Sequence, residues 1–152
     1  MKKLSSVWDF IGISNEEDQE KIKGWVFHPE KELLIIDGGM GKTTAAFIIA
    51  EIASLKSGAF PMIENDAGKG IPFRHNGTIV TTNDWGNLKR RLSTKKKFIR
   101  ITKPEISGEL NPDWLQMYKD KFNELEEEII GWKETPYPDN NTDNLSGTIN
   151  IR

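Results

Sequence analysis

Apolar residues form two dense runs in the first third of the chain, and a glycine-rich stretch separates them. The first run, over residues 32–37, is typical of a buried strand, and the second, over residues 45–53, consists of strong helix formers. A basic last turn followed by Gly58 is typical of a helix end, so we expect this helix to span residues 42–55. The pattern therefore predicts a strand, a loop and a buried helix in direct succession.

Other segments also have patterns that predict regular structure. Residues 77–82 and 98–102 are rich in β-branched and apolar residues, as strands are. A short helix is predicted over residues 15–23, with Ser14 or Asn15 as its cap. Residues 113–130 predict an amphipathic helix. Its apolar positions are spaced by alternating fours and threes, at Tyr118, Phe122, Leu125, Ile129 and Trp132.

The remaining segments predict little regular structure. Residues 59–76 contain two prolines and a Gly-Lys-Gly tip, which favours a loop or a hairpin. From residue 133 onward, prolines and a run of Asp and Asn favour a flexible tail. We therefore expect an α/β fold, with a small, mostly parallel sheet, flanking helices and a C-terminal amphipathic helix. The expected organisation is a helical packing segment over 1–30, an α/β domain over 31–132 and a tail over 133–152.

Composition excludes several function classes. A chain of 152 residues suits one domain with a real core, and it has no cysteine, which excludes disulfides, thiolate metal sites and a cysteine nucleophile. Two histidines cannot form a histidine metal cluster. The net charge of −2 excludes a globally basic nucleic-acid binder, although basic residues are concentrated over 89–97. Since no apolar run approaches the ~20 residues that span a bilayer, we expect a soluble, intracellular protein without membrane contact.

The glycine-rich stretch carries the clearest chemistry. Glycines let the backbone direct its N–H groups at an anion, the following helix N-terminus adds a positive dipole, and Lys42 supplies an ammonium group. The Thr43 hydroxyl stands where it can hold Mg²⁺. The residues expected to bind the phosphates of ATP are Gly38, Gly39, Gly41, Lys42, Thr43 and Thr44. The expected sheet is therefore of the P-loop NTPase type, and residues 31–132 are expected to form a reduced P-loop domain. The first glycine of the full G-x-x-x-x-G-K-[ST] pattern is replaced by Ile36, and the alternative is a glycine-rich turn with a merely solvated lysine.

Three segments together resemble the superfamily 3 helicase part of replication initiators from circular single-stranded DNA viruses and their satellites. The phosphate loop of that family often reads G-G-x-G-K-[ST], as residues 38–43 do here. Residues 67–73 resemble its lysine-containing loop, and residues 78–83 resemble the strand after it, which ends in Thr-Thr-Asn. Arginines at 88–92 followed by a strand at 98–101 resemble its third segment. The resemblance covers roughly residues 32–102.

The resemblance implies roles for individual residues. Lys69 would grip single-stranded DNA in the pore of a ring, Asn83 would position water or sense the γ-phosphate, and Arg90 or Arg91 would be an arginine finger for a neighbouring subunit. Clustered charge extends the expected DNA contacts to Lys89, Lys95, Lys96 and Lys97. Each position also has a simpler interpretation: Lys69 as a turn lysine, Asn83 as a strand-end cap, and the basic run as a solvated face.

The acidic strand of that family is the main departure. Only 26 residues lie between Lys42 and Lys69, and within them Glu64 and Asp66 are the candidates for the acids that hold Mg²⁺ and polarise water. Pro61 argues against a central strand there. Either a very short strand carries the two acids or the acidic strand has been lost. The nicking domain of these initiators, with its paired histidines and nucleophilic tyrosine, has no counterpart in residues 1–30.

Two functions therefore stand as expectations. The first is an ATP- and Mg²⁺-binding, helicase-like module that acts in replication of circular single-stranded DNA with weak hydrolysis, in the host nucleus if the virus is eukaryotic. The second is a non-catalytic binding protein that modulates a full-length initiator by joining its ring. A nucleotide kinase is disfavoured because no lid or set of substrate-binding arginines is evident.

Overall fold

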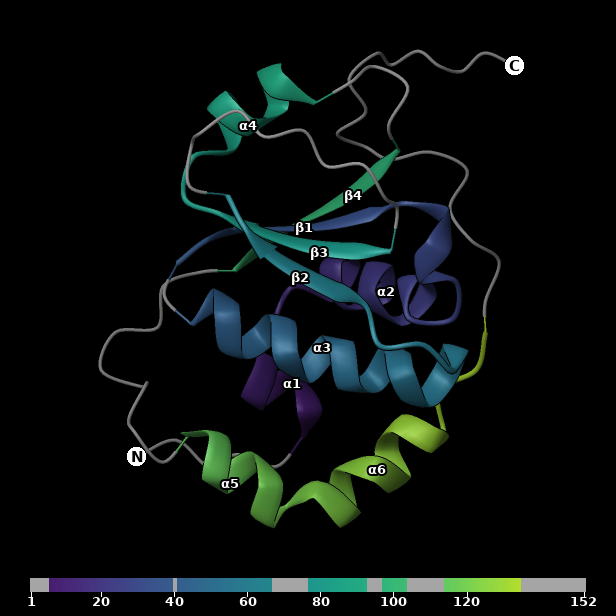
Figure 1. Cartoon of the computed structure of the whole chain (residues 1–152). Helices are drawn as coiled ribbons and strands as arrows, with labels where there is room; N and C mark the ends of the chain where they lie inside the picture. The colour runs from purple at the N-terminus through teal and green to yellow at the C-terminus, as the bar shows by residue number, and fades with distance from the viewer. Residues whose placement is uncertain (1–5, 40, 67–76, 93–96, 104–113, 135–152) are drawn as a thin grey trace.

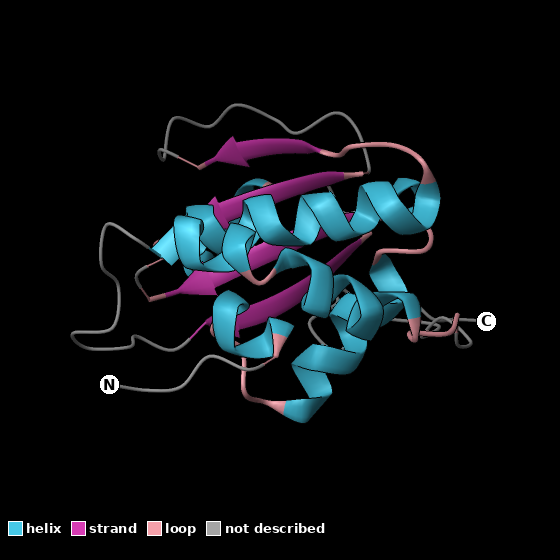
Figure 2. Ribbon diagram, turned by 90° about the horizontal axis from the view of Figure 1, so that it is seen from below, coloured by secondary structure: helices cyan, strands magenta, loops and turns pink. Residues whose placement is uncertain are grey.

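The computed structural model describes residues 6–39, 41–66, 77–92, 97–103 and 114–134. Within them, four strands form one parallel sheet in the order β2-β3-β1-β4. The strands are β1 (Leu33–Gly38), β2 (Met62–Asn65), β3 (Thr78–Thr82) and β4 (Phe98–Lys103). All four arrows point the same way in Figure 2. The predicted α/β fold with a small parallel sheet is confirmed.

Helices cover both faces of this sheet (Figure 1). The covering of one face consists of α1 (Val7–Ile11), α2 (Glu16–Trp25), α3 (Lys42–Ser57), α5 (Trp114–Asp120) and α6 (Phe122–Ile130). On the opposite face lies α4 (Trp85–Arg91). A short 3-10 turn, η1 (Pro29–Lys31), leads into β1. None of the described helices is both long and apolar enough to cross a membrane.

The central strand β1 is buried on both faces, which explains its unbroken apolar run. Because side chains alternate along a strand, Leu34 and Ile36 join the large cluster under α3, whereas Leu33 and Ile35 join the smaller cluster under α4. The large cluster also contains side chains from α1, α2, α5 and α6. Residues 7–26 therefore pack into the same core as the sheet.

The two helical crossovers lie on opposite faces because the chain moves in opposite directions across the sheet. The first crossover leads from β1 through α3 to β2, and the second leads from β3 through α4 to β4. A right-handed connection reverses the face it covers when its direction reverses. The chain therefore leaves β1 toward the face that α3 covers and leaves the adjacent strand β3 toward the face that α4 covers. The gap between the carboxyl ends of these two strands is a topological switch point.

The structure differs from the leading sequence predictions at three elements. Residues 62–65, predicted as a loop or hairpin with a very short strand as the alternative, form strand β2 in parallel pairing with β3. Pro61 is tolerated because it lies before an edge strand, where a missing N–H breaks no ladder. Helix α4 was not predicted, although the Asp84 side chain accepts a hydrogen bond from the Asn87 backbone N–H at 3.1 Å and caps it. Helix α1 was also not predicted.

The amphipathic stretch 113–130 is two helices rather than one. At Lys121 the backbone leaves helical geometry, with φ −98° and ψ 7°, and α6 starts at the next residue. Tyr118 on α5 and Leu125 on α6 are nevertheless both about 1% exposed, so the two helices bury one shared apolar face. The predicted spacing is correct, and both helices bury this face in the same cluster as α1 and α3, next to which they lie in Figure 1.

Candidate phosphate-binding site

The candidate site lies at the carboxyl edge of the sheet, where ligands of open α/β sheets bind at a switch point. Because all four described strands are parallel, their carboxyl ends meet there. The edge is formed by Gly38 at the end of β1, Asn83 after β3, Lys103 at the end of β4 and Asp66 after β2. Three of these four residues were expected from the sequence to act in nucleotide chemistry.

The loop after β1 requires glycine for steric reasons. Gly38 has φ +119°, and a Cβ at this position would lie 2.5 Å from the backbone oxygen of Lys103. The next residue, Gly39, donates its backbone N–H to the same oxygen at 2.6 Å. Gly41 is the N-cap of α3 with φ +86°. The loop is thus pressed against the end of β4 and enters α3 through a left-handed turn, as a backbone cradle for an anion requires.

Lys42 is the first residue of α3, and its ammonium group is held by three acceptors. Its Nζ donates to the backbone oxygens of Gly38 at 2.8 Å and Gly39 at 3.0 Å, and to the Asn83 side-chain oxygen at 2.6 Å. These bonds use all three donors of the ammonium group. The contact with Asn83 spans the switch point between β1 and β3. The structure therefore brings together the two residues that sequence reasoning named for phosphate binding and phosphate sensing.

The two threonines follow directly in the first turn of α3. Thr43 is exposed and Thr44 is half-buried. Both lie at the positive end of a 16-residue helix, where free backbone N–H groups and the helix dipole favour a negative ligand. An exposed hydroxyl at Thr43 fits the position from which a loop threonine holds Mg²⁺.

Lys103 is a residue of this edge that sequence reasoning missed. Only 2% of it is exposed, and its Nζ has no hydrogen-bond partner in the described part of the chain. Burial lowers the pKa of Lys103, and the positive charge of Lys42 lowers it further. The signal in the sequence was the period of two: Lys103 continues the series Ile99 and Ile101, whose side chains join the cluster under α3.

Asp66 is placed in an ion pair with Arg91 rather than beside Lys42. Its carboxylate accepts two hydrogen bonds from Arg91 Nη2, at 2.7 and 3.0 Å, and one from the Thr82 hydroxyl at 3.1 Å. The Asp66 side chain is only 5% exposed. Arg91 is held further by the Asn87 side-chain oxygen at 2.7 Å. One expected metal ligand and one expected arginine finger are thus bound to each other within the same chain.

Glu64, the second candidate acid, lies in the edge strand β2 opposite Val80, a residue of the α4-side cluster. The residues directly before and after it, Ile63 and Asn65, therefore lie on the opposite face of the strand, which α3 covers. Asn65 accepts a 3.3 Å hydrogen bond from the Thr81 hydroxyl. Along β2, the polar side chain on the face of α3 is thus an amide, and the Glu64 carboxylate is on the face of α4.

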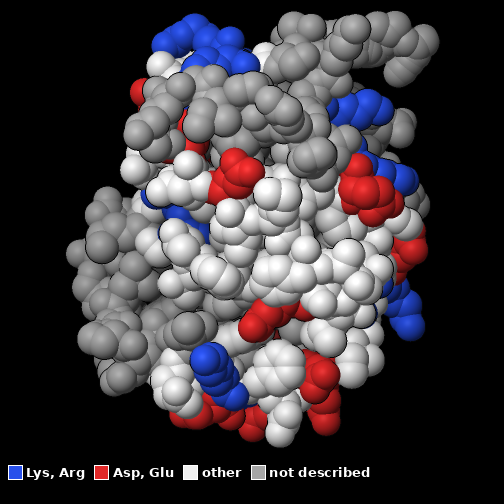
Figure 3. Space-filling view, in the orientation of Figure 1, with Lys and Arg blue, Asp and Glu red and all other residues white. Residues whose placement is uncertain are grey.

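The expected DNA-binding residues are placed only in part. Lys89 and Arg90 are exposed on α4, and Lys97 is exposed just before β4. Basic side chains gather over α4 in Figure 3, while acidic side chains gather at the opposite end over α5 and α6. Lys69, Lys95 and Lys96 lie outside the described residues.

A second charged pair flanks the loop on the face covered by α4. Asp37, the residue before Gly38, forms an ion pair with Arg100 at 3.5 Å, and the Arg100 guanidinium lies 5.1 Å from the centre of the Trp85 ring. Trp85 in turn meets Phe98 edge to face. These contacts connect the end of β1, strand β4 and the start of α4 on one face of the sheet.

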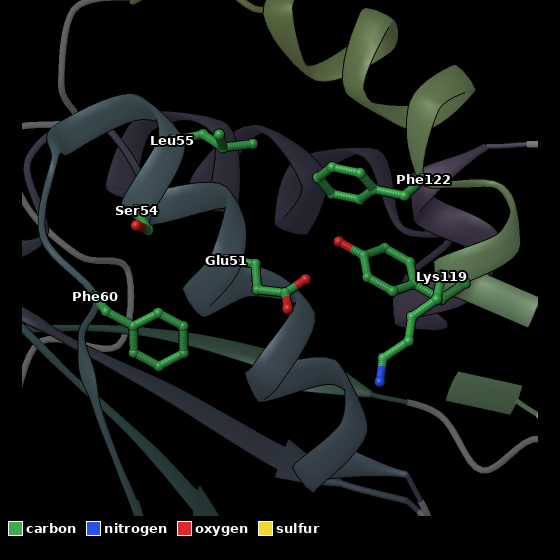
Figure 4. Close-up of a pocket in the computed structure, with 7 residues that line it drawn as sticks. Glu51, Ser54, Leu55, Phe60, Lys119 and Phe122 are labelled. Atoms are coloured by element: carbon green, nitrogen blue, oxygen red, sulfur yellow. The ribbon is translucent and has the colours of Figure 1, made fainter. Parts of the chain in front are cut away.

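A hollow of about 420 Å³ lies away from this edge, between α3 and the helices α5 and α6 (Figure 4). Its lining consists of Glu51, Ser54, Leu55, Phe60, Tyr118, Lys119 and Phe122. Burial, helped by the Glu51 carboxylate, raises the pKa of the Tyr118 hydroxyl. The largely apolar lining contains none of the residues of the carboxyl edge, so this hollow is separate from the candidate phosphate site.

No protein-family model, curated protein or solved structure matches this chain. The geometry at the carboxyl edge is therefore the basis for assigning a function.

Proposed function

We propose that this chain is a P-loop module that binds a nucleoside triphosphate with Mg²⁺ at the carboxyl edge of its sheet. One observation carries the proposal: the Lys42 ammonium group bridges the loop carbonyls and Asn83 across the switch point. A phosphate that replaces these acceptors would meet Lys42, the N–H groups at the start of α3 and the Asn83 amide together. Thr43 would hold the Mg²⁺ ion, which neutralises phosphate charge.

Hydrolysis by this site is proposed to be weak. Phosphoryl transfer requires a metal held by the loop threonine and by an acid, with a group that orients water. Asp66 is paired with Arg91 and Thr82, so it would have to leave three hydrogen bonds to serve the metal. Glu64 lies on the α4 face of the sheet. Each ~1.4 kcal/mol lost from transition-state stabilisation slows turnover tenfold. We therefore expect this chain to bind ATP but to hydrolyse it slowly.

The first test is binding of ATP with Mg²⁺ to the Lys42→Ala variant. We expect an affinity at least tenfold lower than that of the wild type, because one charge-assisted contact with phosphate is worth about 1.5–3 kcal/mol. Isothermal titration calorimetry measures this directly. Turnover measured on the same samples should remain slow in the wild type.

Lys133→Ala is the matched control for this test. Lys133 is exposed, and its charge acts on Lys56 in the last turn of α3. A helical rise of about 1.5 Å per residue places Lys56 about 21 Å from Lys42. This variant removes one positive charge without touching the loop. Equal affinities for ATP in the wild type and in Lys42→Ala would contradict the proposed phosphate site.

A second ligand, single-stranded DNA, is favoured by the exposed basic surface of α4. Lys89 and Arg90 are both solvent-exposed there, whereas Arg91 is bound to Asp66. Exposed cations near the carboxyl edge suit contacts with a phosphate backbone. We propose that α4 contacts single-stranded DNA through Lys89 and Arg90, whose positive charges lie next to each other on its exposed side. Modulation of a longer initiator by joining its ring is the alternative role for the same surface.

The DNA proposal predicts a change in salt dependence. Replacing Lys89 and Arg90 together by alanine should weaken oligonucleotide binding and flatten the slope of log K against log salt by about 1.4, since each lost contact with single-stranded DNA contributes about 0.7. Fluorescence anisotropy over a salt series measures the slope. The matched control replaces Lys119 and Lys133 together by alanine, because both are exposed on the side of α5 and α6 and the substitution also removes two positive charges. If both double variants lower the slope equally, α4 is not the DNA site.

A further inference from the structure

Among the residues that the structure describes, the Lys103 ammonium group at the end of β4 is buried without a hydrogen-bond partner. Burying an ammonium group without compensation costs free energy, and for that reason buried lysines are normally paired. A methionine would fill similar space at this position without that penalty. An unpaired buried cation that a fold retains therefore requires a different explanation.

The position of Lys103 indicates what would pair with it. Its residue is the register partner of Gly38, and its backbone oxygen accepts the Gly39 N–H at 2.6 Å. Because side chains alternate along a strand, the Lys103 side chain lies on the same face of β4 as Ile99 and Ile101, which is the face that α3 covers. Lys42 reaches the loop carbonyl of Gly38 from the start of α3. Lys42, Lys103 and the positive end of α3 thus converge at one place.

The electrostatics of this place are unfavourable without a ligand. The charge of Lys42 disfavours the protonated form of Lys103 and contributes to its lowered pKa. The acceptors of the Lys42 ammonium group are neutral carbonyl oxygens from Gly38, Gly39 and Asn83, which leave its charge uncompensated. A polyphosphate brings several negative charges and would relieve both the repulsion and the missing hydrogen bonds.

We propose that Lys103 is a second phosphate-binding lysine, supplied by β4, which pairs with the polyphosphate of the bound nucleotide together with Lys42. This inference rests on the proposed function and deepens it, because it assigns phosphate recognition to two elements, α3 with Lys42 at its start and β4 with Lys103 at its end. The site then selects ligands by phosphate charge, so triphosphates bind more tightly than monophosphates for a reason that Lys42 alone does not provide.

The test uses Lys103→Met in two measurements on the whole chain. Without ligand, the variant should unfold in urea at the same or a higher midpoint than the wild type, because an unpaired buried charge has been removed. Its affinities for ATP with Mg²⁺ and for tripolyphosphate should both fall at least tenfold, while AMP binding changes less. A gain in stability combined with a loss of affinity is a pattern that a merely structural lysine would not produce.

Ile101→Met is the matched control, because it places the same side chain two residues earlier on the same buried face. Affinity for tripolyphosphate that falls equally in both variants, or a Lys103→Met protein that is less stable than the wild type, would overturn the inference. If Lys42→Ala loses ATP binding and Lys103→Met keeps it, the inference fails while the proposed function stands. A wild-type chain that binds neither ATP nor tripolyphosphate would overturn both.

Discussion

Replacing Gly38 by alanine is expected to lower the free energy of unfolding by about 3 kcal/mol or more. Two physical causes add up at this position. A φ of +119° is strained for any residue with a side chain, and the new Cβ would lie 2.5 Å from the Lys103 backbone oxygen. Because that oxygen belongs to the ladder between β1 and β4, relief of the contact would require the loop to move away from β4. Urea unfolding measured by fluorescence gives the change.

Gly58→Ala is the matched control for the Gly38 variant. Gly58 also has a positive φ, +89°, but a Cβ there would meet nothing within 4 Å. It therefore isolates the conformational strain, which is worth about 1–2 kcal/mol. We also expect Gly38→Ala to weaken ATP binding, since the Gly39 N–H would lose its place on β4. Equal losses of stability in the two variants would show that the loop is not pressed against β4.

Replacing Asp66 by alanine is expected to cost about 3 kcal/mol of stability. The side chain of Asp66 is 5% exposed and that of Arg91 is 22% exposed, so loss of the carboxylate leaves a largely buried guanidinium group unpaired. The Thr82 hydroxyl would lose its acceptor at the same time. The partial exposure of Arg91 lets water compensate in part, which sets the expected value at the lower end for a buried pair. Urea unfolding again measures it.

A double-mutant cycle separates the ion pair from other effects of the substitution. Asp66→Ala and Arg91→Ala should couple by about 2 kcal/mol, because each single variant strands the other partner. Arg90→Ala, on the exposed side of the same helix, should change stability by no more than about 0.5 kcal/mol. A coupling near zero would mean that the pair is not formed in solution.

A second substitution of Asp66, Asp66→Asn, tests whether this residue acts in catalysis. If Asp66 were a metal ligand instead, Asp66→Asn would leave stability nearly unchanged and would remove Mg²⁺-dependent nucleotide binding or turnover. The structure favours the opposite result, since the three hydrogen bonds to its carboxylate come from β3 and α4. Stability and Mg²⁺ dependence measured on one variant therefore distinguish a structural acid from a catalytic one.

Features carried by consecutive residues were predictable from the sequence. The strand before Gly38, the loop and the helix from Lys42 all follow from local hydrophobic pattern and glycine spacing, so their bounds agree with β1 and α3 within about two residues. Strands β3 and β4 followed for the same reason. Local signals also existed where prediction failed: Asp84 caps α4, and Lys103 stands in phase with a buried face.

The tertiary structure alone decided which of these residues meet. Lys42 and Asn83 are 41 positions apart and meet because β3 lies next to β1, and Asp66 reaches Arg91 because β2 lies on the far side of β3. Strand order depends on how the crossovers pack onto the sheet, and no local pattern encodes it. The sequence by itself therefore determined a glycine-rich strand–loop–helix segment on an α/β fold, whereas the packing of β4 against that loop decided that a second lysine is buried beside it.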